Sequence, residues 1–185
     1  MIDDTLLEAE DKMDKAVEVA RDRMSNIRTG RANAAMFNAI LVDYYGAPTP
    51  LQQLASLQIP EARTVLISPY DRGASSAIDK ALRASDLGVN PTDDGNVLRV
   101  VLPALTEERR RDYVKLARNE AEDARISVRA VRRKAKEELD RLVKDGEVGE
   151  DEGTRAEKEL DALTKSHVET IDQVVEAKEK DLLEV

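Results

Sequence analysis

The chain has 185 residues and a net charge of −9 at pH 7. Charged residues make up 36% of it and aromatic residues only 3%, a composition typical of amphipathic helical proteins and unlike that of an aromatic-rich β-sandwich. The absence of cysteine excludes disulfides, a thiol nucleophile and a zinc–thiolate site, and the acidic balance argues against a general nucleic-acid-binding protein.

Residues 2–27 predict a first amphipathic helix. Apolar side chains recur there at alternating spacings of three and four, with charged residues between them. Acids cluster at its start and Arg28 follows at its end, as the helix dipole favours. Gly30 then predicts a helix end or a hinge. The acidic start has no secretory signal and no run approaches a membrane span, so we expect a soluble, cytoplasmic protein.

The middle of the chain has shorter patterns than the rest. Runs rich in β-forming residues predict strands at 38–45, 63–70 and 96–102. Residues 46–50 (GAPTP) predict a rigid turn, and residues 75–87 a short helix capped by Ser75 or Ser76 and closed by Gly88. Four of the five aromatic residues lie in this segment, which indicates a separate small α+β domain with its own core.

A long helix from Thr106 to Gly146 organises the remainder. It has no internal proline or glycine and would extend ~60 Å, too long for an ordinary small core. Its apolar stripe contains Val114, Ala117, Ala121, Ala124, Val128, Val131, Ala135 and Leu142, with Leu139 beside the interrupting Glu138. After an acidic loop at 147–153, residues 154–183 predict a third helix. Its apolar stripe contains Ala156, Leu160, Leu163, His167, Ile171, Val174 and Ala177.

These patterns predict an α+β protein with two domains. Three long amphipathic helices cannot bury their apolar stripes alone, so residues 1–29 and 105–185 should form a three-helix bundle. Residues 31–104 would be a domain inserted into that bundle. The chain crosses between the domains near 28–33 and near 103–105, and two short adjacent linkers predict a hinge.

A row of cations runs along the long helix. Residues 125–136 contain six Arg or Lys and no acid, which leaves −15 for the rest of the chain. The basic stripe, as we call it, consists of Arg125, Arg129, Arg132, Arg133 and Lys136, and helical geometry predicts that it faces solvent. Within its own helix Arg129 should reach only other arginines. Two explanations stay open, a phosphate-bearing partner such as RNA or the acids of a neighbouring helix. With no aromatic platform, RNA would be bound through its phosphates and shape.

No enzymatic site is evident. His167 is the only histidine and lies on an apolar stripe, where a structural role is the usual one. No second His or Cys could complete a metal site, no glycine loop matches a phosphate-binding template, and the acidic run at 145–157 does not fit a calcium loop.

Five motifs together resemble the ribosome recycling factor family over the whole chain. They are IRTGRA at 27–32, YYGAPTPL at 44–51, ASDLGVNP at 84–91, LTEERR at 105–110 and VRAVRR at 128–133. Two positions depart from the family pattern, since Ala34 and Ala104 stand where the family often has proline. Fewer prolines at the linkers would leave the hinge less restrained.

The resemblance implies an L-shaped protein of tRNA-like outline, with a three-helix bundle and a small β/α/β domain. Such factors bind the large ribosomal subunit after termination. With elongation factor G, which hydrolyses the GTP, they split the post-termination complex. The chain would then be a monomer without enzymatic activity, cofactor or membrane partner. The family's important arginines correspond to Arg129 and Arg132, with Arg28 as another rRNA contact.

Two sets of residues are therefore expected to act. The RNA-binding set is Arg28, Arg125, Arg129, Arg132, Arg133 and Lys136, and the hinge set is Gly30, Arg31, Ala104 and Leu105. Two competing hypotheses belong to other classes. An acidic helical adaptor or chaperone would complete its core with another chain and form an obligate oligomer. An enzyme would need a site that the sequence does not contain.

Overall fold

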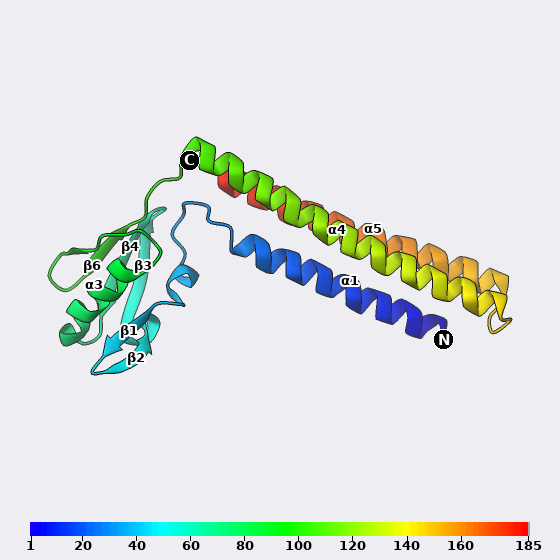
Figure 1. Ribbon diagram of the computed structural model, residues 1–185, viewed down its shortest axis with the longest axis horizontal. Coiled ribbons are helices and arrows are strands. Elements are labelled where there is room, and N and C mark those ends of the chain that lie inside the picture. The colour runs from blue at the N-terminus through cyan, green and yellow to red at the C-terminus, as the bar shows by residue number, and fades with distance from the viewer. Residues whose placement is uncertain (185) are drawn as a thin grey trace. The chain divides into compact units, whose positions relative to one another are not determined.

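The computed structural model describes residues 1–184 and divides into two compact units (Figure 1). One unit consists of Met1–Arg28 together with the chain from Glu107 onward, and the other is Thr29–Thr106. The second unit is thus inserted between the first and second helices of the first unit. This division places residues 29, 105 and 106 in the inserted unit.

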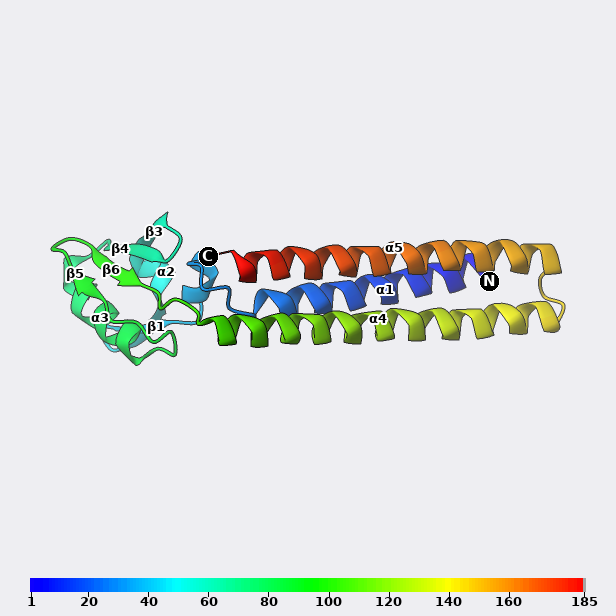
Figure 2. The ribbon, with the colours of Figure 1, turned by 90° about the horizontal axis from the view of Figure 1, so that it is seen from above.

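The first unit is a bundle of three helices, α1 (Ile2–Ser25), α4 (Glu107–Lys144) and α5 (Glu150–Leu183). They lie side by side in both views, with α1 and α5 running in one direction and α4 in the other (Figures 1 and 2). A single apolar core runs between them and takes residues from all three helices. The predicted bundle is therefore confirmed.

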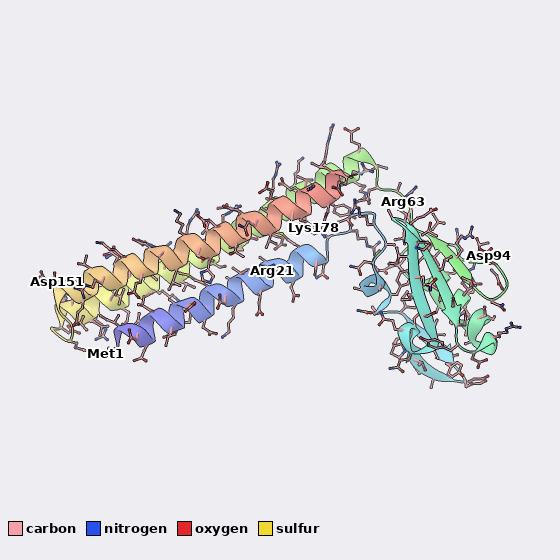
Figure 3. The ribbon with its side chains drawn as sticks, turned by 180° about the vertical axis from the view of Figure 1, so that it is seen from behind. Met1, Arg21, Arg63, Asp94, Asp151 and Lys178 are labelled. Atoms are coloured by element: carbon pink, nitrogen blue, oxygen red, sulfur yellow. The ribbon has the colours of Figure 1, made fainter. Side chains whose placement is uncertain are left out.

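The predicted apolar stripes of α1 and α4 are largely buried, but that of α5 needs correction. Beyond Ile171 the buried residues are Val175 and Leu182, whereas Val174 is half-buried and Ala177 is exposed. Successive steps of three from Ile171 drift off the buried face by about 60° each, because an α-helix turns 100° per residue. The observed spacing of four, three and four includes position 178, which is occupied by Lys178 (labelled in Figure 3).

The helix ends also differ from expectation in two places. Helix α1 ends at Ser25, capped by Asn26 in a right-handed conformation, so Gly30 is not its terminator. Helix α5 begins at Glu150, four residues before the expected start. Its first turn contains Glu150, Asp151 and Glu152, and acids are stabilised at that end of the helix dipole. Gly146 has φ of +70°, which confirms the left-handed end of α4.

The inserted unit combines a four-stranded antiparallel sheet, a β-hairpin and short helices. The sheet contains β3 (Ala55–Glu61), β4 (Thr64–Pro69), β5 (Thr92–Asp93) and β6 (Leu98–Val101) in the order β3-β4-β6-β5. The hairpin pairs β1 (Leu41–Tyr44) with β2 (Ala47–Pro50). The helices are α2 (Leu51–Leu54) and α3 (Ser75–Ala84), with 3-10 turns at Ala34–Phe37 and Arg72–Ala74.

This unit has its own apolar core, as predicted, and the predicted strands correspond to β1, β4 and β6. Its largest fully buried side chains include Phe37, Ile67, Ile78, Leu82 and Leu98. The tyrosines contribute less than their number suggested, since the side chains of Tyr45 and Tyr70 are 83% and 71% exposed. Helix α3 follows directly from a 3-10 turn. Its N-cap is therefore Ala74, and the predicted caps Ser75 and Ser76 are instead its first two residues.

The prediction of a rigid turn at residues 46–50 is wrong. The chain reverses at Tyr45 and Gly46, whose φ angles of 50° and 83° are those of a two-residue primed turn, and Tyr44 pairs with Ala47. Residues 47–50 continue as strand β2. Its two prolines are tolerated because the hairpin ladder has only two strands and β2 needs to pair on one side alone.

Candidate nucleic-acid interface

The basic stripe on α4 divides into an inner and an outer part. The side chains of Arg125, Arg132 and Lys136 are 21%, 35% and 34% exposed, so they lie partly between helices. Arg129, by contrast, is 57% exposed, and Arg133 is also exposed. The angular position of each residue around α4 accounts for this, since Arg129 and Arg133 are rotated furthest from α5.

The inner cations form ion pairs with acids of α5. Arg125 places Nε and Nη2 at 2.8 and 2.6 Å from Asp172 Oδ1. Arg132 places Nε and Nη2 at 2.8 and 2.7 Å from Asp161 Oδ1. Lys136 Nζ lies 3.4 Å from Glu157 Oε1 and 3.0 Å from Asp140 Oδ1. The prediction that the whole stripe faces solvent is therefore wrong for these three residues, and acids of the neighbouring helix compensate their charge.

The electrostatics of the inner cations agree with a structural role. Burial opposes the charged form of Arg125, but hydrogen bonds to Asp172 and Glu122 outweigh it and raise the pKa of the guanidinium. A hydrogen bond to Asp140 similarly raises the pKa of Lys136. Carboxylates of α4 and α5 thus partner these three cations within the bundle.

The outer cations are held weakly. Arg129 Nη1 lies 3.9 Å from Glu122 Oε1, so Arg129 reaches an acid that we did not expect, seven residues earlier on its own helix. Arg133 makes no hydrogen bond or ion pair with any residue of the described chain 1–184. Two exposed guanidiniums one turn apart on a long rigid helix can each bind a phosphate in bidentate fashion.

Arg28, the sixth residue of the predicted RNA-binding set, lies away from the basic stripe. Arg23 Nη1 lies 3.1 Å from Glu120 Oε2, which fixes the level of the α1 C-terminus along α4. Arg28 is five residues further on and exposed. At about 1.5 Å per residue it lies on the order of 20 Å along the bundle from Arg129. Arg28 would thus contact a different part of any extended partner.

Two of the four predicted hinge residues lie against each other. Gly30 has φ of +78°, and a Cβ atom added to it would stand 3.3 Å from Leu105 Cγ. Glycine is required here both for the left-handed backbone and for the close approach. Arg31 and Ala104 are exposed beside this contact. The chain therefore enters and leaves the inserted unit at one place.

The described residues do not support a histidine-based site, a metal site or a membrane-spanning helix. His167 is buried, and its ring nitrogens lie 2.7 Å from Leu163 O and 2.7 Å from Asp14 Oδ1, so both positions are occupied within the bundle. Residues 1–184 contain no group of three or more side chains arranged to hold a metal ion. None of the helices in that range is long and apolar enough to cross a membrane.

Comparison with known proteins gives consistent matches. The family described as "Ribosome recycling factor" matches residues 20–183. Among curated relatives, the ribosome-recycling factors of Beutenbergia cavernae and Kineococcus radiotolerans are 76% and 72% identical to this chain over 185 residues, covering 100% of both chains in each case.

Two solved structures also resemble it. A solution structure of the ribosome recycling factor is 43% identical with a TM-score of 0.76, over 100% of this chain and 98% of that one. The other is described as models for the T. thermophilus ribosome recycling factor and the E. coli elongation factor G bound to the E. coli post-termination complex. It is 40% identical, with a TM-score of 0.65 and full coverage of both chains.

Proposed function

We propose that this chain, which belongs to the ribosome recycling factor family, binds the large ribosomal subunit after termination and splits the post-termination complex together with elongation factor G. The family assignment rests on full-length relatives, and the partners follow from the similar structure bound with elongation factor G. The chain contributes binding and mechanical coupling. Elongation factor G hydrolyses the GTP, so the chain needs no cofactor or catalytic residue of its own and acts in the cytoplasm.

The observation that carries an RNA-binding role is the contrast within the basic stripe. Inner cations have carboxylate partners at 2.6–3.4 Å, whereas Arg129 has one at 3.9 Å. Arg133 has none among the described residues. Exposed like charges on one helix face cost a few tenths of a kcal/mol per pair unless an anion offsets them. The phosphates of rRNA provide that anion, and Arg28 adds a contact nearer the end of the bundle.

The inserted unit is the part that elongation factor G would move. The contact between Gly30 and Leu105 brings the two linkers to one point, and rotation about a single point needs less rearrangement than rotation about two separate ones. With Arg31 and Ala104 exposed beside it, this contact forms the proposed hinge. The bundle would stay anchored on rRNA while the inserted unit is driven against the contacts between the subunits.

A monomer is the form that acts. The apolar stripes of α1, α4 and α5 pack against one another within a single chain, so the bundle core needs no second chain to complete it. This supports the translation factor over the adaptor hypothesis, which requires an obligate oligomer. A solution mass measurement distinguishes the two.

The experiment that tests the proposal measures splitting of purified post-termination ribosomes with elongation factor G and GTP. The wild-type chain should split them, and Arg129→Gln with Arg133→Gln should bind large subunits more weakly while keeping the helical circular dichroism of the wild type. We expect a loss of about 10-fold or more in affinity for two removed phosphate contacts. Folded wild-type protein that fails to split ribosomes would refute the proposed function.

A further inference from the structure

Two ion pairs between α4 and α5 follow a seven-residue spacing that the third position interrupts. Arg118 pairs with Glu179, and Arg125 pairs with Asp172. Each step of seven residues along α4 is matched by a step of seven back along α5, as expected for antiparallel helices in contact. The next step brings Arg132 opposite position 165, which is Lys165 rather than an acid.

The interruption changes how Arg132 is held. Its guanidinium pairs instead with Asp161, four residues beyond Lys165 on α5, at 2.7 Å. Lys165 is left with one distant partner, since its Nζ lies 4.0 Å from Glu169 Oε1 and its side chain is 79% exposed. Ion pairs this long and exposed contribute little. Lys165 is therefore a weakly held cation on the edge of α5 that meets the basic stripe.

The neighbouring ion pairs bound the level of Lys165 along the bundle. The alignment of Arg125 with Asp172 would place position 165 level with residue 132 of α4, and the alignment of Arg132 with Asp161 would place it level with residue 128, so Lys165 lies within about one turn of Arg129 along the bundle. Helical geometry puts Lys165 within about 40° of both Asp161 and Asp172 around α5. Three weakly held cations from two helices, namely Arg129, Arg133 and Lys165, thus lie near one another along the edge where α4 meets α5.

We propose that Lys165 is a phosphate contact of the rRNA-binding surface, so that the RNA backbone lies across the edge between α4 and α5 rather than along α4 alone. This inference rests on the proposed function. The chemistry suits the position, because a lysine ammonium on a flexible stem binds a phosphate as a point charge while the arginines bind in bidentate fashion. An acid at 165 would pair with Arg132 and leave a surface of lower positive charge.

The test measures binding to purified large ribosomal subunits over a range of salt concentrations. Lys165→Gln should raise the Kd about three- to ten-fold and reduce the slope of log K against log salt by about one. Lys165→Glu should weaken binding further, because its carboxylate adds repulsion of phosphates and competes for Arg132. Lys180→Gln is the matched control on the same helix, and its Kd and slope should equal those of the wild type.

Arg129→Gln separates this inference from the proposed function. If Arg129→Gln weakens binding while Lys165→Gln matches the wild type in Kd and slope, the inference about Lys165 is wrong and the α4 site stands. If both variants bind like the wild type, the rRNA-binding role of this surface is wrong as well. If Lys180→Gln weakens binding as much as Lys165→Gln, the effect reflects net charge and Lys165 is not a specific contact.

Discussion

His167 joins α5 to α1 through Asp14, with 2.7 Å between its Nε2 and the Oδ1 of the carboxylate. Its Nδ1 lies 2.7 Å from Leu163 O on its own helix. The buried His167 side chain thus links α5 to Asp14 of α1, whose side chain is 65% exposed at the edge of the bundle core.

This link should be measurable as a coupling energy. We expect Asp14→Ala and His167→Ala each to destabilise the bundle, His167→Ala by about 2–4 kcal/mol because it also leaves a cavity. The double variant should be less destabilised than the sum, with a coupling of about 0.5–1.5 kcal/mol. Urea unfolding of the four proteins provides the free energies. Strictly additive effects would show that the hydrogen bond contributes nothing.

Substitutions of Arg125 and Arg133 should have different effects, the first on the stability of the bundle and the second on binding to large subunits. Arg125→Gln removes ion pairs to Asp172 and Glu122 from a half-buried side chain, and should lower the free energy of unfolding by about 1 kcal/mol. Arg133→Gln should leave that free energy within about 0.5 kcal/mol of the wild type but weaken binding to large subunits. Thermal unfolding and subunit binding on the same preparations test both halves. The opposite assignment of effects would contradict the division of the stripe.

Lys178 should limit the stability of the bundle at neutral pH. Burial on the apolar face of α5 lowers its pKa from the ordinary value of 10.5, and Asp181 only partly opposes this. A lowered pKa means that the unfolded chain binds the proton more tightly, so stability rises as pH increases through the folded pKa toward 10.5. Lys178→Met should therefore stabilise the bundle, by less than about 1 kcal/mol.

The pH dependence of this gain provides its control. The advantage of Lys178→Met over the wild type should be full near pH 7 and shrink as pH approaches 10.5, where the lysine is neutral in both states. Lys180→Met, at an exposed position of the same helix, should give no such pH-dependent gain. A constant difference between Lys178→Met and the wild type across this range would contradict desolvation as the cause.

Gly153 should resist replacement although it lies in a helix. Alanine is normally better there by about 1 kcal/mol. A Cβ atom at this position, however, would stand 2.5 Å from Val143 Cγ2, and a β-branched valine in a helix has few other rotamers. Overpacking of this kind costs about 1–3 kcal/mol, so Gly153→Ala should be destabilising overall.

The same contact predicts a rescue. With Val143→Ala already present, the clash disappears and Gly153→Ala should become neutral or stabilising, as helix propensity alone requires. Chemical unfolding of the single and double variants is sufficient. Gly153→Ala that stabilises the otherwise unchanged chain would show that α4 and α5 can separate at this end without cost.

Periodicity in the sequence predicts which residues of a helix are buried, and this explains how much of the bundle could be foreseen. Val128 and Leu160 are buried because they lie on stripes that a single helix already defines. Periodicity does not give the axial alignment of two helices. The pairing of Arg132 with Asp161 depends on that alignment and was not predicted.

The inserted unit was harder to predict for a different reason. Strand β2 contains Pro48 and Pro50, which usually argue against a strand, and only its position in a two-stranded ladder permits them. Strand β3 has a bulge between Gln58 and Glu61 and lacks a clear alternation of buried and exposed residues. Local sequence carries little information about such pairings, because the partner strands decide them.

The contact of Gly30 with Leu105 has a consequence for folding. Both ends of the inserted unit meet at this contact, so residues 30–105 form a closed loop. The entropic cost of closing that loop is offset by the packing of the unit's own apolar core. For the bundle, the inserted unit then acts as a short connection between α1 and α4, whatever the length of the inserted chain. A few residues joining positions 29 and 106 would accordingly leave a bundle able to fold, and the excised segment would keep adjacent termini suited to insertion elsewhere.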